Sequence, residues 1–212
     1  MIGVASDGQT IAIGSEVSDA LAAELEAIVA DAPLAPPEQP PASLARCEAL
    51  LIDAVGPVNR RAGLGYWIPP GTAFASDATM HTSGSTDIQA LRRCTVDRRN
   101  WSVDEWNKLL DGAFGPWAIA TAGEHAVSVC HSARLTEHAA EAGVWTDPEH
   151  RGRGHAAAVT AAWASVPALA GRHLFYSTND DNRSSQRVAA RLGLRPIGWL
   201  WRLQGEQATG GA

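Results

Sequence analysis

The stretch from Val144 to Ala156, VWTDPEHRGRGHA, has residue types suited to binding an anion. Strand-forming residues lead into a proline turn, and an Arg-Gly-Arg-Gly loop then opens an alanine-rich segment that is predicted to be helical. The first N–H groups of a helix lack internal partners, and the helix dipole adds partial positive charge there. Gly152 and Gly154 allow close backbone approach, while Arg151 and Arg153 add full charges. A pyrophosphate would suit this loop.

The elements around this loop predict one sheet of mixed direction. The first two strands form a hairpin, and the later ones are connected through helices. Two other phosphate motifs are absent: there is no Walker-type sequence, and no third glycine follows Gly154 as a dinucleotide fingerprint requires. The predicted strands are 117–121, 126–135, 140–146, 173–178, 194 and 197–203, with helices over 154–166 and 182–192.

The N-terminal half contains fewer signals. Ser102 and Glu105 form a capping-box pattern with Trp101 and Trp106 placed as a hydrophobic staple, which predicts a helix over 103–110. A proline-rich connector over 33–41 can be neither helix nor central strand. Residues 72–90, rich in Thr, Ser, Ala, Asp and Gly, are expected to form a long loop. The remaining predictions are strands at 10–14 and 63–68 and helices at 18–30 and 44–55.

Composition excludes several classes of protein. The formal net charge of −6 argues against nucleic acid as a partner, because phosphate backbones require a basic face. The three cysteines are far apart, so neither a disulfide framework nor a zinc site is expected, and no metal is called for. No apolar run is long enough to span a membrane, and the N-terminus lacks a signal-peptide pattern. The expected setting is the cytoplasm.

The loop and its surroundings resemble the GNAT superfamily of acyl-CoA N-acyltransferases. Arg151-Gly-Arg-Gly-His-Ala156 resembles that family's acyl-CoA loop, Arg/Gln-x-x-Gly-x-Gly/Ala, and Asp147-Pro148 lies upstream where the family has it. Asn182, Ser185 and Leu192-Gly193-Leu194 are similar to its second signature. The resemblance covers roughly residues 100–204. It implies an α/β fold with a mixed, splayed sheet flanked by α-helices.

The resemblance also implies a domain organisation and a set of coenzyme contacts. Residues 1–95 would be an extension on the acceptor side, 96–204 the catalytic core and 205–212 a flexible tail. Backbone groups of the strand before the loop would pair with the pantetheine arm. The loop and first helical turn would hold the pyrophosphate. The implied acetyl-CoA contacts are Val144, Trp145, Thr146, Arg151, Gly152, Arg153, Gly154, His155, Ala156, Ala157, Asn182 and Ser185.

The implied reaction is direct attack of an amine on the bound thioester. A base removes the ammonium proton, and strand N–H groups polarise the carbonyl. Glu141, on the strand leading to the loop, is one candidate base, and a sheet-face carboxylate paired with arginine is the structural alternative. His131 is another candidate, with a satisfied or surface histidine as its alternative. Tyr176 is a candidate acid or substrate contact, although core packing explains it equally simply. The family's usual tyrosine acid is replaced here by Ala189.

Three functions stay open at this point. N-acetyl transfer from acetyl-CoA to a small-molecule or peptide amine is the first. A non-catalytic acyl-CoA-binding module is the second, because the usual tyrosine is missing. Another acyl-CoA reaction on the same fold, such as O-acyl transfer or malonyl decarboxylation, is the third. The acceptor and the oligomeric state, including a homodimer through the last strand, stay open as well.

Overall fold

The computed structural model describes residues 1–85 and 87–205, which form two compact units. The first unit contains residues 1–65, 178–182 and the described part of the C-terminal segment from Pro196. The second contains residues 66–177 and 183–195. The predicted flexible tail, 205–212, lies outside the described residues except for Gly205, which ends the last strand.

A mixed sheet forms the centre of the second unit. Its strands follow the order β4-β5-β6-β7-β8. The pairs from β4 to β7 are antiparallel, whereas β7 and β8 are parallel. This confirms the predicted hairpin followed by a helical crossover. The bounds are β4 (Thr79–Thr82), β5 (Trp117–Ala122), β6 (His125–Leu135), β7 (Ala139–Thr146) and β8 (His173–Asn179).

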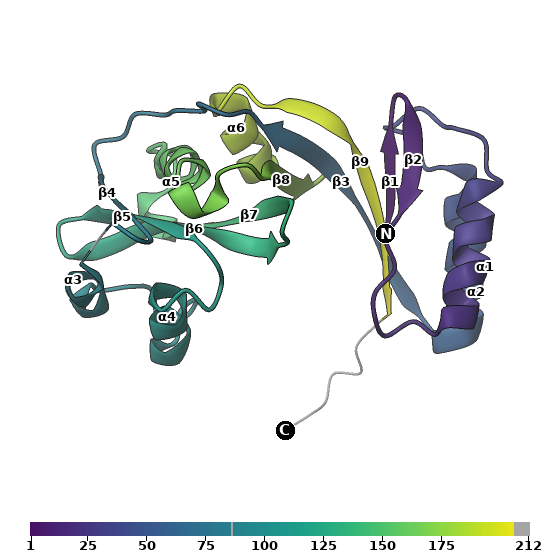
Figure 1. Cartoon of the computed structure of the whole chain (residues 1–212), viewed down its shortest axis with the longest axis horizontal. Coiled ribbons are helices and arrows are strands. Elements are labelled where there is room, and N and C mark those ends of the chain that lie inside the picture. The colour runs from purple at the N-terminus through teal and green to yellow at the C-terminus, as the bar shows by residue number, and fades with distance from the viewer. Residues whose placement is uncertain (86, 206–212) are drawn as a thin grey trace. The chain divides into compact units, whose positions relative to one another are not determined.

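Helices cover both faces of this sheet (Figure 1). α5 (His155–Ala164) packs on one face, with α6 (Arg183–Arg191) beside it. α3 (Ile88–Arg93) and α4 (Val103–Leu110) lie on the other face. α5 is buried on most sides, because its many alanines bring it close to the strands. The α/β fold class with a mixed sheet flanked by helices is therefore confirmed.

Aromatic residues build the core between α4 and the sheet. The Trp101 and Trp106 rings meet edge to face with centroids 6.0 Å apart, as the predicted staple requires. The Trp106 indole donates a hydrogen bond of 3.1 Å to the carbonyl of Leu91, which ties α4 to α3. Trp117 and Ile119 of β5 close the same cluster from the sheet side. The core thus fixes the strands that carry the loop.

The capping box at the start of α4 gives a stability test. The Glu105 N–H donates to Ser102 Oγ (3.2 Å), and the Ser102 N–H donates to the Glu105 carboxylate (3.0 Å). Ser102→Ala is expected to cost about 1 kcal/mol of unfolding free energy, or about 2–4 °C in Tm. Thermal unfolding followed by circular dichroism measures it. Ser184→Ala, on the exposed side of α6, is the control and should leave Tm within about 1 °C; an equal loss in both variants would contradict the cap.

The first unit is a small sheet with two helices. The strands follow the order β2-β1-β9-β3, and β1 pairs antiparallel with both β2 and β9. Ser18 accepts a hydrogen bond from the Leu21 N–H at the start of the first helix, as a cap should. Both predicted helices are present. The bounds are β1 (Ile2–Ala5), β2 (Gly8–Ile11), α1 (Asp19–Ala30), α2 (Ala42–Val55), β3 (Val58–Ile68) and β9 (Arg195–Gly205).

Three local predictions differ from the structure. The strand predicted at 10–14 lies at 8–11 in a hairpin, and the strand predicted at 63–68 begins at Val58. The loop predicted at 72–90 contains β4 and begins α3. β4 has polar residues at three of its four positions, Thr79, His81 and Thr82, so no alternation of apolar residues marks it. This segment forms a strand because it pairs with β5.

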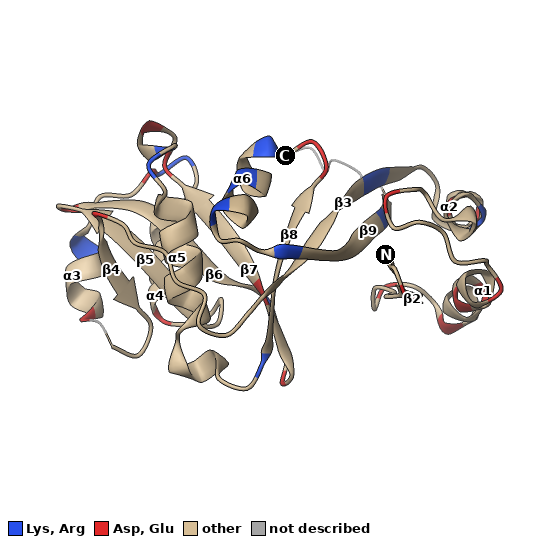
Figure 2. Cartoon of the chain, turned by 90° about the horizontal axis from the view of Figure 1, so that it is seen from above, with Lys and Arg blue, Asp and Glu red and all other residues tan. Residues whose placement is uncertain are grey.

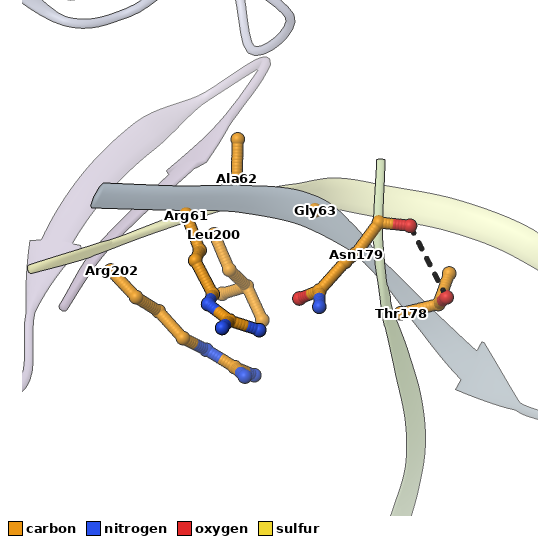
Figure 3. A pocket seen from close by; sticks show the side chains of 7 residues that line it. All are labelled: Arg61, Ala62, Gly63, Thr178, Asn179, Leu200 and Arg202. Atoms are coloured by element: carbon orange, nitrogen blue, oxygen red, sulfur yellow. Dashed lines mark hydrogen bonds between the residues drawn. The ribbon is translucent and has the colours of Figure 1, made fainter. Parts of the chain in front are cut away.

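A close backbone approach shapes a hollow in the first unit (Figure 3). A Cβ at Gly63 would stand 2.1 Å from the carbonyl oxygen of Thr178, so only glycine fits there. The Asp180 N–H donates to the carbonyl of Ala62 (3.0 Å) at the same place. The hollow is shallow and is lined by Arg61, Ala62, Gly63, Thr178, Asn179, Leu200 and Arg202.

Candidate functional site

The predicted anion loop connects β7 to α5. The Asp147 carboxylate accepts a hydrogen bond from the Glu149 N–H (2.8 Å) and starts the turn. Gly152 and Gly154 have φ angles of +82° and +90°, a left-handed backbone that side chains disfavour. Gly154 is also the N-cap residue of α5, and it has no side chain that could accept a hydrogen bond from the N–H groups of the first turn. The first-turn N–H groups, which lack partners inside the helix, therefore point into the loop.

Other segments of the second unit hold this loop. Arg191 at the end of α6 donates through Nη2 to the carbonyl of Gly152 (3.2 Å). Arg151 donates through Nε to the carbonyl of Thr146 (3.4 Å). Both loop cations that the sequence singled out are exposed, since Arg153 is also at the surface. Three arginine side chains therefore lie around the loop: Arg151, Arg153 and Arg191.

The segment before β4 packs on the same loop, which sequence reasoning missed. The Phe74 ring lies against Gly154, where an added Cβ would stand 3.0 Å from Phe74 Cε1. Ser76 Oγ is 3.2 Å from Nδ1 of His155, and this histidine is only 3% exposed. These contacts join positions about eighty residues apart in the chain. No local sequence signal reports them.

The parallel strands before the loop separate. The register of β7 with β8 runs from Ala139↔His173 to Ala142↔Tyr176 and, within the described residues, goes no further. β7 itself continues to Thr146, still paired with β6 on its other side. The β8-side edge of β7 beyond Ala142 therefore has backbone groups outside the β7–β8 ladder. The predicted splay is confirmed at the position the loop requires.

The place beyond Ala142 where β7 and β8 separate is called the fork below. His131 lies beside it, on the face of the sheet that α4 covers. It pairs across the strands with Gly143, and a Cβ on Gly143 would stand 2.9 Å from His131 Cε1. The imidazole packs edge to face on Trp101 and tilted on Phe114, with centroids 6.1 and 5.9 Å away. Its Nδ1 is buried without a hydrogen-bond partner among the described residues. Burial lowers the pKa of His131, so the ring is neutral at pH 7.

Glu141 lies on the same face but is already bonded. Its carboxylate pairs with the guanidinium of Arg134 and accepts a hydrogen bond from Ser177 Oγ. The side chain is 19% exposed. Both carboxylate oxygens of Glu141 therefore already have partners. Glu141 therefore has the geometry of the structural alternative given above, a carboxylate on the sheet face paired with an arginine.

Tyr176 lies on the opposite face, towards α5 and α6. Its hydroxyl is hydrogen-bonded to Ser185, and burial raises its pKa to about 12. The Tyr66 ring packs against it with centroids 6.3 Å apart. Ala189 is buried and lies one helical turn beyond Ser185, on the same face of α6. The side chain at this position, next to Tyr176, is therefore small. The phenol therefore stays protonated at neutral pH.

The other predicted contact residues occupy the expected elements. Val144, Trp145 and Thr146 form the diverging end of β7, although the Trp145 side chain packs into the aromatic core. Ala156 and Ala157 lie in the first turn of α5. Asn182 precedes α6, where its N–H donates to the carbonyl of Asn179 (3.1 Å).

The described residues contain neither a cluster of metal-binding side chains nor a helix that could span a membrane. No group of three or more His, Cys, Asp or Glu side chains is placed to hold a metal ion in this part of the chain. No helix in residues 1–85 and 87–205 is both long and apolar enough to cross a bilayer. Cys130 is fully buried, and burial raises the pKa of its thiol, so it is not a nucleophile.

Comparison with known proteins identifies the family. The family described as "Acetyltransferase (GNAT) domain" matches residues 70–195, more than half of the 212-residue chain. The chain therefore belongs to the GNAT acetyltransferase family. A search of curated proteins gives no match.

Solved structures share the fold at low sequence identity. An acetyltransferase from the GNAT family of Colwellia psychrerythraea is 16% identical with a TM-score of 0.52, over 78% of this chain and 63% of that one. A GCN5-related N-acetyltransferase of Kribbella flavida gives 16% and 0.52, over 76% and 63%. A GCN5-related N-acetyltransferase-like protein of Streptococcus suis gives 16% and 0.52, over 76% and 68%. The chain thus spans less than two thirds of the first two structures.

Proposed function

We propose that this protein transfers the acetyl group of acetyl-CoA to a primary amine on a small molecule or peptide. The proposal rests on one observation: the fork and the glycine loop follow each other along the same strand, β7. β7 leaves β8 after Ala142, runs four more residues, and turns into the glycine loop at the start of α5. Those four residues span about 13 Å. An extended arm with a thioester at one end and a diphosphate at the other suits that span.

Backbone groups would hold the coenzyme. The free edge of Val144–Thr146 pairs with the pantetheine arm as an added strand. The N–H groups of Gly152–Ala157 bind the diphosphate, and Arg151 and Arg153 add charge. These assignments place the acetyl carbonyl at the fork, beside Gly143.

The two faces of the sheet then take different parts of the reaction. The amine approaches on the α4 side, where neutral His131 accepts a proton from the ammonium group. The amine nitrogen forms the C–N bond with the acetyl carbon, and the C–S bond breaks. The departing thiolate faces the α5 side and takes the proton of Tyr176. As the C–S bond breaks, the nitrogen releases its second proton to solvent, and the Tyr176 phenolate takes a proton back from solvent. His131 then releases the first proton to solvent. The acetylated amine and CoA are the products.

Tyr176 gives a test with a modest expected effect. Tyr176→Phe is expected to lower kcat roughly tenfold, because a thiolate with a conjugate pKa of about 8.5 also leaves partly unaided. Steady-state kinetics at saturating acetyl-CoA measure it. Tyr66→Phe is the control, since this neighbouring ring lies against Tyr176 with no role in proton transfer. Equal kcat values for the wild type and Tyr176→Phe would exclude Tyr176 as the acid.

The function itself is tested by calorimetric titration of acetyl-CoA, followed by a panel of amines with release of free CoA thiol as the readout. Micromolar binding and turnover of at least one amine support acetyl transfer. Binding without turnover on any amine would instead support a non-catalytic acyl-CoA-binding module. Loss of carbon dioxide from malonyl-CoA, or acetylation of an alcohol, would support another reaction on the same fold. Absence of binding would overturn the proposal.

A further inference from the structure

Between β3 and β4 the chain passes over the start of α5 (Figure 1). Residues 72–78 of this connection belong to no helix or strand, yet their burial alternates like that of a strand. The even-numbered residues from Thr72 to Ala78 are half-buried, and the odd-numbered residues between them are exposed. One face of the connection therefore rests on the second unit through its side chains.

Two side chains of this face meet the start of α5. The Phe74 ring lies against Gly154, and Ser76 Oγ lies 3.2 Å from Nδ1 of His155. The same hydroxyl oxygen accepts a hydrogen bond from the N–H of Ala78 (3.2 Å), which fixes its direction. His155 is almost fully buried. The contacts therefore reach the N-cap and the first residue of the helix, where the glycine loop ends.

The start of α5 lacks the groups that usually fix the first turn of a helix. Its N-cap is a glycine, so no side chain accepts from the first-turn N–H groups, and no acidic residue lies in that turn. The whole helix carries no Lys, Arg, Asp or Glu, and Figure 2 shows it in a single colour. A glycine loop that is free to move loses conformational entropy when it binds a ligand. Contacts from outside the helix reduce that cost, because they hold the loop in its binding geometry beforehand.

We infer that Phe74 and Ser76 are positioning residues for the glycine loop, an inference that rests on the proposed function. Neither side chain needs to touch the coenzyme. Phe74 acts through Gly154 and Ser76 acts through His155, whose backbone N–H groups belong to the proposed diphosphate site. Coupling between two sites is reciprocal, so a connection that favours the bound loop is itself stabilised when the coenzyme binds.

The first measurement is the dissociation constant of acetyl-CoA, by calorimetry. Ser76→Ala and Phe74→Leu should each raise it roughly tenfold, the effect of one lost hydrogen bond or packing contact. Ser76→Thr keeps the hydroxyl and should stay within about twofold of wild type. Ser83→Ala is the matched control, because Ser83 Oγ also accepts a hydrogen bond, from the Trp117 N–H (3.1 Å), at the opposite end of β4. It should lower Tm but leave the dissociation constant unchanged.

Hydrogen exchange gives a readout that a purely structural role would not change. Saturating acetyl-CoA should slow amide exchange in peptides covering 72–80 roughly tenfold in wild type, the same factor by reciprocity. In Ser76→Ala this protection should largely disappear. Peptides of α3 should exchange equally with and without the coenzyme in both proteins. In steady-state kinetics, Ser76→Ala should raise KM for acetyl-CoA while kcat at saturating substrates stays within about twofold.

The outcomes separate this inference from the proposed function. Binding of acetyl-CoA by wild type, with unchanged affinity in Ser76→Ala and Phe74→Leu, overturns the positioning role and leaves coenzyme binding intact. Weaker binding in Ser76→Ala that Ser76→Thr does not restore also overturns it, as does a lack of coenzyme-dependent protection of 72–80 in wild type. Absence of binding by wild type overturns both proposals. Circular dichroism melts establish that each variant is folded, and if Phe74→Leu is not, the Ser76 variants decide.

Discussion

Gly154→Val is expected to weaken acetyl-CoA binding at least roughly a hundredfold. Valine at φ +90° is strained, and its Cβ would stand 3.0 Å from the Phe74 ring. Relief of both moves the backbone that begins α5, so the first-turn N–H groups no longer converge on one diphosphate. A hundredfold loss corresponds to about 2.8 kcal/mol, the scale of two charge-assisted hydrogen bonds. Calorimetric titration of acetyl-CoA measures it.

Gly171→Val is the matched control. Gly171 also has a left-handed backbone, with φ +80°, but nothing lies within 4 Å of its missing Cβ. Both variants should lose about 1–2 kcal/mol of unfolding free energy from backbone strain. Only the loop variant should lose binding. Equal affinities for acetyl-CoA in the two variants would show that the loop does not contact the coenzyme.

His131→Gln is expected to lower kcat by roughly 10²–10⁴ with little change in the dissociation constant of acetyl-CoA. The imidazole is neutral, its Nδ1 has no partner among the described residues, and it packs on Gly143 where the strands separate. Glu141→Gln serves as the comparison, because that carboxylate is held by Arg134 and Ser177. It should lower kcat less than tenfold. The reverse ranking of the two variants would assign the base to Glu141.

The pH profile follows from the direction of the pKa shift. Burial alone lowers the pKa of His131, and the groups against it are the uncharged rings of Trp101 and Phe114. kcat/KM should therefore stay level from neutral pH down to about 6.5 and fall only below it. The same shift stabilises the folded protein above pH 6.5 and is lost in acid, because the unfolded chain takes up the proton first. The acid limb should vanish in His131→Gln.

Local sequence signals predicted the elements around the loop well. The Ser102–Glu105 box fixed α4 over Val103–Leu110, and the glycines marked where α5 begins. Each signal acts within one helical turn, so its physics is contained in a few neighbouring residues. The splay was implied by family resemblance and not by any residue pattern, since strand separation depends on partners far apart in the chain.

The choice among catalytic candidates needed the structure. His131 and Glu141 lie on adjacent strands and have ordinary sequence surroundings, yet one is enclosed by aromatic rings and the other is paired with arginine. Burial and pairing are tertiary properties, so no local sequence pattern reports them. The same holds for Phe74 and Ser76, which reach the loop from a segment whose polar composition predicted only a loop.

Alternation along β7 has a consequence for how such a protein can diverge. Neighbouring residues of a strand point to opposite faces, so Gly143 belongs to the side of His131 whereas Ala142 belongs to the side of Tyr176. A substitution at one of these positions therefore changes one face of the sheet and leaves the other face nearly unchanged. The sheet acts as a partition between two independently variable surfaces. In the proposed reaction, substitutions on the α4 face would change the preference for the acceptor amine without altering the face that carries Tyr176.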